Sequence, residues 1–338
     1  MNKLITFASS MVLSLGMSSM TYAADYNLKI AGWAPPTHGM NAIMWPTLVK
    51  MMEEATDGRV TGELKLGFAP PPAMMDLVQD GAVDMSIIFH GYQPGRFVAN
   101  KLIELPGYIG NAEMASVAYW RVYESHLAAL KEHRGVKLVA LTTHGPGQFH
   151  NKADVKSLAE MDGLKTRIGG GVASDVAAEL GLVGIRVPAP KVYETLASGA
   201  ADAVAIPYEG RKSFKLTEVA KNVFEMPGGF YRGSFAIIMN EDTYNNMPKD
   251  IQEALTSKVF GERTSRMLGA AWDTVDEVGI EATKSTADNT IRIASKNDQA
   301  KFKAITDKVK VKVFKELNDA GIDANTAYEM VKAEMGAL

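Results

Sequence analysis

The chain has 338 residues, no cysteine and a formal net charge of −3 at pH 7. Without cysteine it can form no disulfide, thiolate nucleophile or cysteine-ligated metal site, and the near balance of charges gives no electrostatic footprint for nucleic-acid binding. The length allows two domains or one large domain.

Residues 1–23 are predicted to be a cleaved secretory signal. Lys3 supplies a positive charge, Leu4 to Gly16 is mostly apolar, and Thr21–Tyr22–Ala23 ends in the small residue that a signal peptidase accepts. This apolar run is too short to span a bilayer, and no later run reaches about 18 apolar residues. A membrane anchor is the alternative, and the lack of a lipid-accepting cysteine argues against it. We therefore expect a periplasmic mature protein that begins at Ala24.

The first part of the mature chain alternates strands and helices. A short strand is expected at Leu28–Gly32, and Trp33–Gly39 is the loop that leaves its carboxyl end. The following elements are a helix from about Asn41 to Ala55, a strand at Leu64–Phe68, a helix from Pro70 through Val78 that stops at Gly81, and a buried strand at Val83–Phe89. This alternation predicts a parallel sheet covered by helices.

One of these units occurs twice, because residues 70–88 match residues 188–206 without a gap. The identical positions are Pro70/Pro188, Pro72/Pro190, Gly81/Gly199, Ala82/Ala200, Asp84/Asp202 and Ile88/Ile206, and Asp76 falls on Glu194. Each copy reads as a proline-marked start, a helix, a glycine stop, an aspartate and an apolar strand. Units of this kind share such punctuation by chance, but the ungapped match goes beyond it. Two similar α/β lobes are therefore predicted.

Between the two copies the chain is expected to pass from one lobe to the other. A helix is predicted at Ala112–Leu130 and a strand at Val136–Leu141. The strand leads into Thr142–Gly147, a glycine- and proline-rich cluster typical of a crossover.

The stretch from Gly163 to Ile168 is predicted to be a strand that ends in a candidate ligand anchor. Its side chains alternate with period 2, and Gly169–Gly171 then allow a sharp turn into a helix at Val172–Leu180. Arg167 thus lies at the carboxyl end of a strand, where open α/β sheets hold their ligands, and its planar guanidinium fits a carboxylate. The alternative is a surface arginine that ends an edge strand, and these residues alone leave both open.

Beyond Ile206 the chain is predicted to be mostly helical. A helical segment runs to about Ala220, and Phe230–Ser234 precedes a strand at Phe235–Met239 that should cross back. Asp242 is expected to cap a helix directly after this strand, and the remaining helices are expected from Pro248 to about Ser285, at Asn297–Leu317 and at Ala324–Ala337.

Three motifs carry a resemblance to a known family. They are Gly163–Leu164–Lys165–Thr166–Arg167, then Val192–Tyr193–Glu194–Thr195–Leu196 with Gly199–Ala200–Ala201–Asp202, and Leu77–Val78–Gln79–Asp80–Gly81–Ala82–Val83–Asp84. With these motifs, essentially the whole mature chain resembles the substrate-binding proteins of tripartite ATP-independent periplasmic (TRAP) transporters.

The resemblance implies an α/β fold of the two-lobe periplasmic binding protein kind, with a ligand cleft between the lobes and a long C-terminal helical segment. It also implies that Arg167 pairs with a small organic anion, usually a carboxylate. The expected bounds are 24–144 plus 233–272 for the first lobe and 145–232 plus 273–338 for the second.

The chain departs from the family at a few positions. Ala203 stands where many members have glycine, and Ile206 stands where some have a polar residue. Members that bind acidic sugars have a second arginine at the position of Gly147, so a ligand like sialic acid is not expected. A second carboxylate has no obvious partner, although Arg96, Arg186, Arg211 and Arg232 remain as candidates.

The other expected ligand-binding residues lie in loops at strand ends. They are the aromatic residues Trp33, Phe89, Tyr92, Phe149, Tyr208 and Tyr231, together with His38, Gln148 and Gly169. Each aromatic residue can equally belong to the core or the hinge, and for His38, His90 and His150 a structural hydrogen bond is the favoured alternative. One charged anchor with several aromatic residues favours a monocarboxylate with an apolar or aromatic body.

Catalytic motifs are missing from the sequence. It contains no Gly-x-Ser-x-Gly elbow, no His-Glu-x-x-His zinc motif, and neither of the glycine-rich nucleotide-binding motifs. We therefore expect no enzyme, cofactor or metal site. The expected partners are a small organic acid and the membrane permease subunits, for a protein that is a monomer. The alternative is a sensor that presents its occupied binding domain to a membrane receptor, and the predicted cleavable signal favours a carrier.

Overall fold

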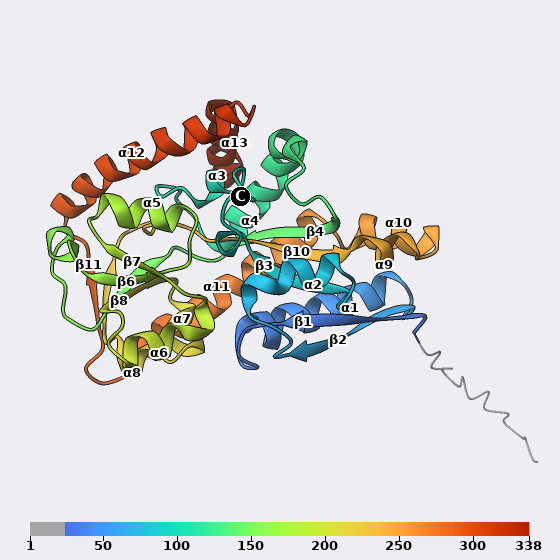
Figure 1. Cartoon of the computed structure of the whole chain (residues 1–338), viewed down its shortest axis with the longest axis horizontal. Helices are drawn as coiled ribbons and strands as arrows, with labels where there is room; N and C mark the ends of the chain where they lie inside the picture. Colours follow the sequence, from blue (N-terminus) through green and yellow to red (C-terminus); the bar gives the residue numbers. More distant parts are fainter. Residues whose placement is uncertain (1–23, 338) are drawn as a thin grey trace, which may run out of the picture.

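The computed structural model describes residues 24–337 and contains two β-sheets, each covered by helices (Figure 1). The predicted signal at 1–23 lies outside the described residues. The first sheet contains, in order across it, β2 (Val60–Leu66), β1 (Tyr26–Gly32), β3 (Met85–Phe89), β10 (Ser234–Asn240) and β4 (Val136–Thr143). The second contains β11 (Thr290–Ile293), β9 (Asn222–Glu225), β5 (Gln148–Asn151), β8 (Ala203–Ile206), β6 (Lys165–Ile168) and β7 (Val183–Arg186). The expected two-lobe α/β fold is confirmed.

Both sheets contain the predicted parallel strands, and each is mixed because crossover strands add antiparallel pairs. Strands β2, β1 and β3 run parallel, and β10 pairs antiparallel with β3. In the second sheet β7, β6 and β8 run parallel, and β5 pairs antiparallel with β8. The reversed strands come from the other lobe: β4 of the first sheet continues into β5 of the second, and β9 of the second returns as β10 of the first. Strands β5 and β10 enter their sheets at the carboxyl ends of the parallel strands and therefore run antiparallel to them.

Helices cover both faces of the sheets. Those of the first lobe are α1 (Trp45–Ala55), α2 (Met74–Gln79), α3 (Lys101–Glu104), α4 (Ala112–Val122), α9 (Glu241–Asn245) and α10 (Lys249–Lys258). Those of the second lobe are α5 (Val172–Glu179), α6 (Val192–Ala197), α7 (Glu209–Ser213) and α8 (Leu216–Val219). Among residues 24–337, no helix combines the length and apolar character needed to cross a membrane.

The last three helices tie the lobes together (Figure 1). Helix α11 (Glu262–Ser285) packs on α4 in the first lobe and on α7 in the second. Helix α12 (Lys296–Asp319) packs on α5, and α13 (Ala324–Ala337) returns to α4. The exact residue bounds given above for the lobes stay a prediction.

The core follows the alternation of side chains along the strands. Successive residues of β10 point to opposite faces, so Ile237 packs with α1, α10 and α11, whereas Ile238 packs with α2 and α4. In the same way Ile30 and its neighbour Ala31 on β1 belong to different clusters. Both faces of the first sheet are thus buried. Because the strands are packed on both sides, the loops at their ends start from fixed positions.

The internal repeat corresponds to a repeated structure. In each copy a proline in extended conformation precedes a 3₁₀ turn and a six-residue helix, α2 or α6. Gly81 and Gly199 then adopt φ of +70° and +79°, the left-handed conformation that favours glycine at a helix C-terminus. The chain enters β3 in the first lobe and β8 in the second.

Some expected elements differ in detail. The helix predicted to run to Leu130 leaves α-helical geometry after Val122 and continues as π and 3₁₀ turns. The helical region expected from Pro248 to Ser285 is broken at Gly261, where φ is +82° and the amide donates to Val139 O at 2.8 Å.

The expected cap of α9 is wrong. Asn240 caps this helix instead of Asp242, because its side-chain oxygen accepts from Thr243 N at 2.8 Å. Asn240 is the last residue of β10, so the strand passes directly into the helix, and Asp242 falls within the first turn.

Candidate functional site

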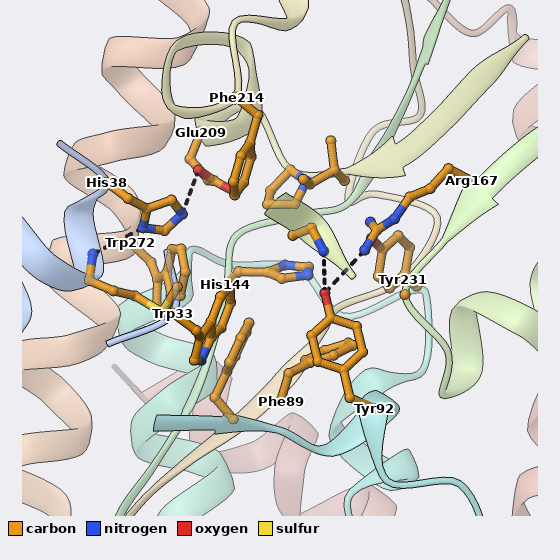
Figure 2. Close-up of a pocket in the computed structure, with 16 residues that line it drawn as sticks. Trp33, His38, Phe89, Tyr92, His144, Arg167, Glu209, Phe214, Tyr231 and Trp272 are labelled. Atoms are coloured by element: carbon orange, nitrogen blue, oxygen red, sulfur yellow. Dashed lines mark hydrogen bonds and ion pairs between the residues drawn. The ribbon is translucent and has the colours of Figure 1, made fainter. Parts of the chain in front are cut away.

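A cavity lies between the lobes, where the carboxyl ends of β1 and β3 face those of β6 and β8. Its lining residues are Trp33, His38, Met40, Phe89, Tyr92, His144, Arg167, Gly169, Ala189, Ile206, Pro207, Glu209, Phe214, Tyr231, Phe235 and Trp272 (Figure 2). The space between them is about 40 Å³, which is room for a few water molecules.

Most of the predicted site residues meet at this cavity. Those that line it are Arg167, Trp33, His38, Phe89, Tyr92, Gly169 and Tyr231. Gln148, Phe149 and Tyr208 do not.

Gln148 and Phe149 serve the connection between the lobes. The Gln148 amide donates to Met226 O at 3.1 Å and accepts from Met226 N at 2.9 Å, so it joins the first crossover to the second. Phe149 is buried against Phe230, with ring centroids 4.5 Å apart. Neither side chain is available to a ligand in the cavity.

Three further candidates make structural hydrogen bonds. The Tyr208 hydroxyl contacts the Glu225 carboxylate, outside the cavity. His150 Nε2 donates to the carbonyl of Ile206 at 2.9 Å, and His90 Nδ1 lies 2.9 Å from Ser234 Oγ. These two histidines thus make structural hydrogen bonds, which was the favoured alternative to ligand contact.

Arg167 presents its guanidinium to the cavity from the end of β6. The residue is only 3% exposed. Its Nε donates to Val187 O at 2.8 Å, Nη1 to Ala205 O at 3.4 Å and Nη2 to the Tyr92 hydroxyl at 3.1 Å. Within residues 24–337 these partners are all neutral, and they use only part of the five-donor fork. A buried cation with neutral partners and spare donors favours an anion beside it.

Aromatic rings form the walls beside this anchor (Figure 2). Phe89 contacts Tyr92 and Phe235, with centroids 4.7 and 5.0 Å apart, and Phe235 in turn lies 5.2 Å from Trp272. Trp33 packs edge-on against Tyr92, and its indole nitrogen donates to Ile87 O at 2.8 Å. Aromatic rings favour edge-on and tilted contacts of this kind, so the cavity is a slot with largely aromatic walls.

His144 is a cavity residue that the sequence analysis passed over as part of the crossover. Burial lowers its pKa to about 4, so the ring is neutral at pH 7. Its Nδ1 lies 2.6 Å from Gly145 O. A carbonyl can only accept, and this contact is much shorter than the 3.4 Å contact from Gly233 N to the same atom, so we assign the proton to Nδ1 and a lone pair to Nε2. His144 follows β4 directly, and the strand-end rule that selected His38 would have found it.

Glu209 and His38 form the other end of the cavity. The His38 Nε2 and Glu209 Oε2 atoms are 3.1 Å apart, and each residue is at most 3% exposed. The rings of Phe214 and Trp272 lie 5.3 and 5.8 Å from that of His38. Glu209, Phe214 and Trp272 were not predicted, and Trp272 comes from α11, far along the chain.

The two lobes are in direct contact around the cavity. The Glu104 carboxylate of α3 accepts from Val172 N, the first residue of α5, at 2.9 Å, and burial raises its pKa. Gly170 has φ of +105°, and a Cβ there would lie 2.2 Å from Gly91 O of the other lobe. Only glycine allows this approach, so the described conformation is closed.

The comparisons with known proteins agree with this geometry. Residues 35–317 match the family described as bacterial extracellular solute-binding protein, family 7. The chain belongs to this family.

Three relatives illustrate the similarity. A TRAP periplasmic solute-binding protein from Bordetella bronchiseptica, with bound (R)- and (S)-mandelate, is 34% identical with a TM-score of 0.88, over 92% of this chain and 99% of its own. A TRAP solute-binding protein from Rhodoferax ferrireducens, with copurified benzoate, is 28% identical with a TM-score of 0.85, over 92% and 98%. The outer membrane transporter protein TsaT from Comamonas testosteroni is 23% identical over 334 residues, 97% of each chain.

The family membership confirms the main expectation from the sequence. The chain is a solute-binding protein of a TRAP transporter, which captures a small carboxylate and delivers it to a membrane permease. The alternative of a sensor gains no support from these relatives. Across residues 24–337, no group of three or more His, Asp or Glu side chains is placed to hold a metal ion.

Gly147, which stands where members of the family that bind acidic sugars have a second arginine, lies against an aromatic ring in this solute-binding protein. A Cβ at Gly147 would lie 2.3 Å from the Tyr231 ring, so this ring fills the space beside the position of the second arginine in acidic-sugar binders. Burial raises the Tyr231 pKa, and the side chain stays a neutral phenol. An aromatic wall thus replaces a second cation.

Proposed function

We propose that this TRAP solute-binding protein captures an aromatic monocarboxylate in the periplasm. The observation that carries the proposal is Arg167, a buried cation without a charged partner among residues 24–337, at one end of a cavity walled by aromatic rings. The carboxylate would pair with the guanidinium, and the ring would lie between Phe89, Tyr231 and Trp33. Aromatic rings favour edge and offset contacts with one another, which suits a planar ligand body.

A dicarboxylate is disfavoured because the cavity offers one basic anchor. Arg211 and Arg232, two earlier candidates for a second one, are buried elsewhere. Arg211 contacts Thr283, Ala220 O and Asn289, and Arg232 contacts the carbonyls of Gly110 and Asn111. A second carboxylate buried in the cavity would have no cation to pair with, and that is costly.

The relatives support the same ligand class. The proteins from Bordetella bronchiseptica and Rhodoferax ferrireducens hold mandelate and benzoate, each a single carboxylate on an aromatic body. Such a protein would act by binding alone, as a monomer, without catalysis.

We further propose that the lobes open about the two crossovers at 144–147 and 226–233. Backbone hydrogen bonds join the crossovers, from Gly147 N to Tyr231 O and from Phe230 N to Gly147 O, both at 2.9 Å. A hinge of this kind lets packed lobes rotate as rigid bodies. Opening would admit a ligand, and closure would bring both lobes around it.

Thermal-shift measurements with defined acids test the ligand class. Benzoate and mandelate should raise the melting temperature, whereas succinate and glucuronate should not, because a ligand stabilises the folded state it binds by about 2.7 kcal/mol at 100 times its Kd. A shift with succinate or glucuronate that exceeds those with the aromatic acids would contradict the proposal.

A further inference from the structure

His38 and Glu209 lie at the end of the cavity away from Arg167 (Figure 2), and one carboxylate oxygen there lacks an aligned hydrogen-bond donor among residues 24–337. Glu209 Oε2 lies 3.1 Å from His38 Nε2, yet within residues 24–337 it has no donor in hydrogen-bonding alignment. Glu209 itself is 3% exposed. Buried carboxylate oxygens normally accept hydrogen bonds, and leaving one without a donor is unfavourable. A group that enters the cavity can supply this donor.

His38 offers the complementary function at the same place. Met40 N donates to His38 Nδ1 at 3.1 Å, so Nδ1 is an acceptor and Nε2 carries a proton. This end of the cavity therefore presents an acceptor on Glu209 next to a donor on His38. A hydroxyl can donate to the first and accept from the second, whereas an ammonium can only donate and a methyl can do neither.

Neighbouring residues position the backbone of Glu209 and the ring of His38. The backbone amide of Glu209 donates to Asp276 Oδ1 of α11 at 2.7 Å. His38 is fixed by Met40 N and by the flanking rings of Phe214 and Trp272. The Trp272 indole nitrogen also lacks a hydrogen-bond partner in the described part of the chain. A ligand therefore meets a preorganised polar end rather than mobile surface groups.

The two ends of the cavity differ in charge and lie on opposite sides of the aromatic slot (Figure 2). A carboxylate is attracted to Arg167 and repelled by Glu209, so the ligand has one orientation only. Its far side must then carry a hydrogen-bond donor, or Glu209 is buried against an apolar surface.

We propose that Glu209 and His38 select aromatic acids that carry a hydroxyl group on the ring, remote from the carboxylate. This inference rests on the proposed function, since it assumes that Arg167 holds the carboxylate. It assigns specificity to two residues from different lobes, so that the hydroxyl is contacted fully only in the closed form.

Calorimetric titration with benzoate and with 2-, 3- and 4-hydroxybenzoate tests the proposal. The 3- or the 4-hydroxy isomer should bind the wild-type protein roughly 10 to 100 times more tightly than benzoate, the range for a hydrogen bond to a charged group. The 2-hydroxy isomer keeps its hydroxyl beside the carboxylate and should gain no such preference. In the Glu209→Gln variant, the affinity for the favoured isomer should be within about threefold of the affinity for benzoate.

Glu225→Gln is the matched control. Glu225 is in the same lobe and contacts the Tyr208 hydroxyl outside the cavity, so this variant should keep the wild-type preference. Wild-type protein that binds benzoate and all three hydroxybenzoates within about threefold of one another would overturn the inference and leave the proposed function standing. Failure to bind any aromatic acid would overturn both. The titrations of the wild-type protein with benzoate and the hydroxybenzoates test the inference even if the Glu209→Gln variant does not fold.

Discussion

The hydroxyl of Tyr92 accepts hydrogen bonds from Arg167 Nη2 at 3.1 Å and from Ala189 N at 2.7 Å. Tyr92 follows β3 of the first lobe, whereas Arg167 and Ala189 belong to the second. The hydroxyl keeps its own proton free to donate. Tyr92 thus joins the closed lobes and places a second donor beside the guanidinium, where a carboxylate would lie.

Tyr92→Phe should therefore weaken both ligand binding and closure. Loss of one buried hydrogen bond costs about 1.4 kcal/mol, or roughly tenfold in affinity for benzoate, and the ligand-free protein should have a larger radius of gyration in solution scattering. Tyr193→Phe is the control, because the Tyr193 hydroxyl contacts Glu218 on the surface. Equal affinity for wild type and Tyr92→Phe would refute the role given to this hydroxyl.

The repeated aspartates should matter for stability and not for binding. Asp84 Oδ2 accepts from Lys29 N at 2.7 Å, and Asp202 Oδ2 accepts from Lys165 N at 3.1 Å. Each aspartate joins neighbouring parallel strands at the same place in its lobe. Asp84 also accepts from the Thr243 hydroxyl at 2.7 Å, so it makes one contact more than Asp202.

We expect Asp84→Ala to lower the free energy of unfolding by about 2 kcal/mol and Asp202→Ala by about 1 kcal/mol. Urea denaturation measures both values. The affinity for ligand should stay unchanged, since neither residue lines the cavity. A tenfold loss of affinity in either folded variant would mean that the repeat has a direct role in binding.

Buried histidines should make the protein unstable in acid. Burial lowers the pKa of His133 and His150 to about 3 and that of His144 to about 4, against about 6.5 in an unfolded chain. The folded state therefore binds fewer protons, and the stability these residues contribute above pH 6.5 is lost as the pH falls toward the folded-state values. Asp276 acts in the opposite direction, because burial raises its pKa.

His150→Gln isolates one of these contributions. Glutamine can still donate to Ile206 O but does not titrate in this range. The loss of unfolding free energy between pH 7 and pH 5 should be smaller in the variant by about 2 kcal/mol, as measured by urea denaturation at each pH. Identical losses in the variant and the wild type would rule out His150 as a source of acid sensitivity.

The sequence predicted those features whose signals lie within a few neighbouring residues. Arg167 and Gly169 belong to one strand and turn, and the repeated proline, glycine and aspartate positions mark α2 and α6. Strands β5, β7, β9 and β11 have four residues each, which shows little period, and they lack the local signals that mark the equally short β6 and β8, the glycine turn after Ile168 and the repeat before Ala203.

The remaining cavity residues depend on contacts that local patterns do not contain. Trp272 reaches the cavity because α11 passes between the lobes, and Glu209 because α7 starts directly after β8. Conversely, Gln148 and Phe149 are near a strand end but on a crossover strand, where their side chains contact the other crossover. A strand-end rule finds the right edge of a sheet but not which side chains face the ligand.

The predicted signal can be tested without a structure. Mature protein from the periplasm should begin at Ala24, or one residue later if the peptidase cleaves after Ala24. Intact-mass measurement distinguishes these products. Retention of residues 1–23 would indicate an anchor.

Arg167→Ala should abolish most ligand affinity and leave folding intact. Removing one side of a buried, hydrogen-bonded charge pair costs about 2–5 kcal/mol, roughly 30-fold to several-thousand-fold in affinity. Arg167→Lys keeps the charge but loses the planar fork, so it should also bind much more weakly. Arg292→Ala is the matched control, because Arg292 pairs with Asp154 on the surface of the same lobe.

Calorimetric titration of the wild type and these three variants with benzoate, alongside their melting temperatures, tests the anchor most directly. The account predicts wild-type affinity for Arg292→Ala and at least a 30-fold loss for a folded Arg167→Ala. A folded Arg167→Ala variant that binds within about threefold of wild type, under ~0.7 kcal/mol, would contradict it.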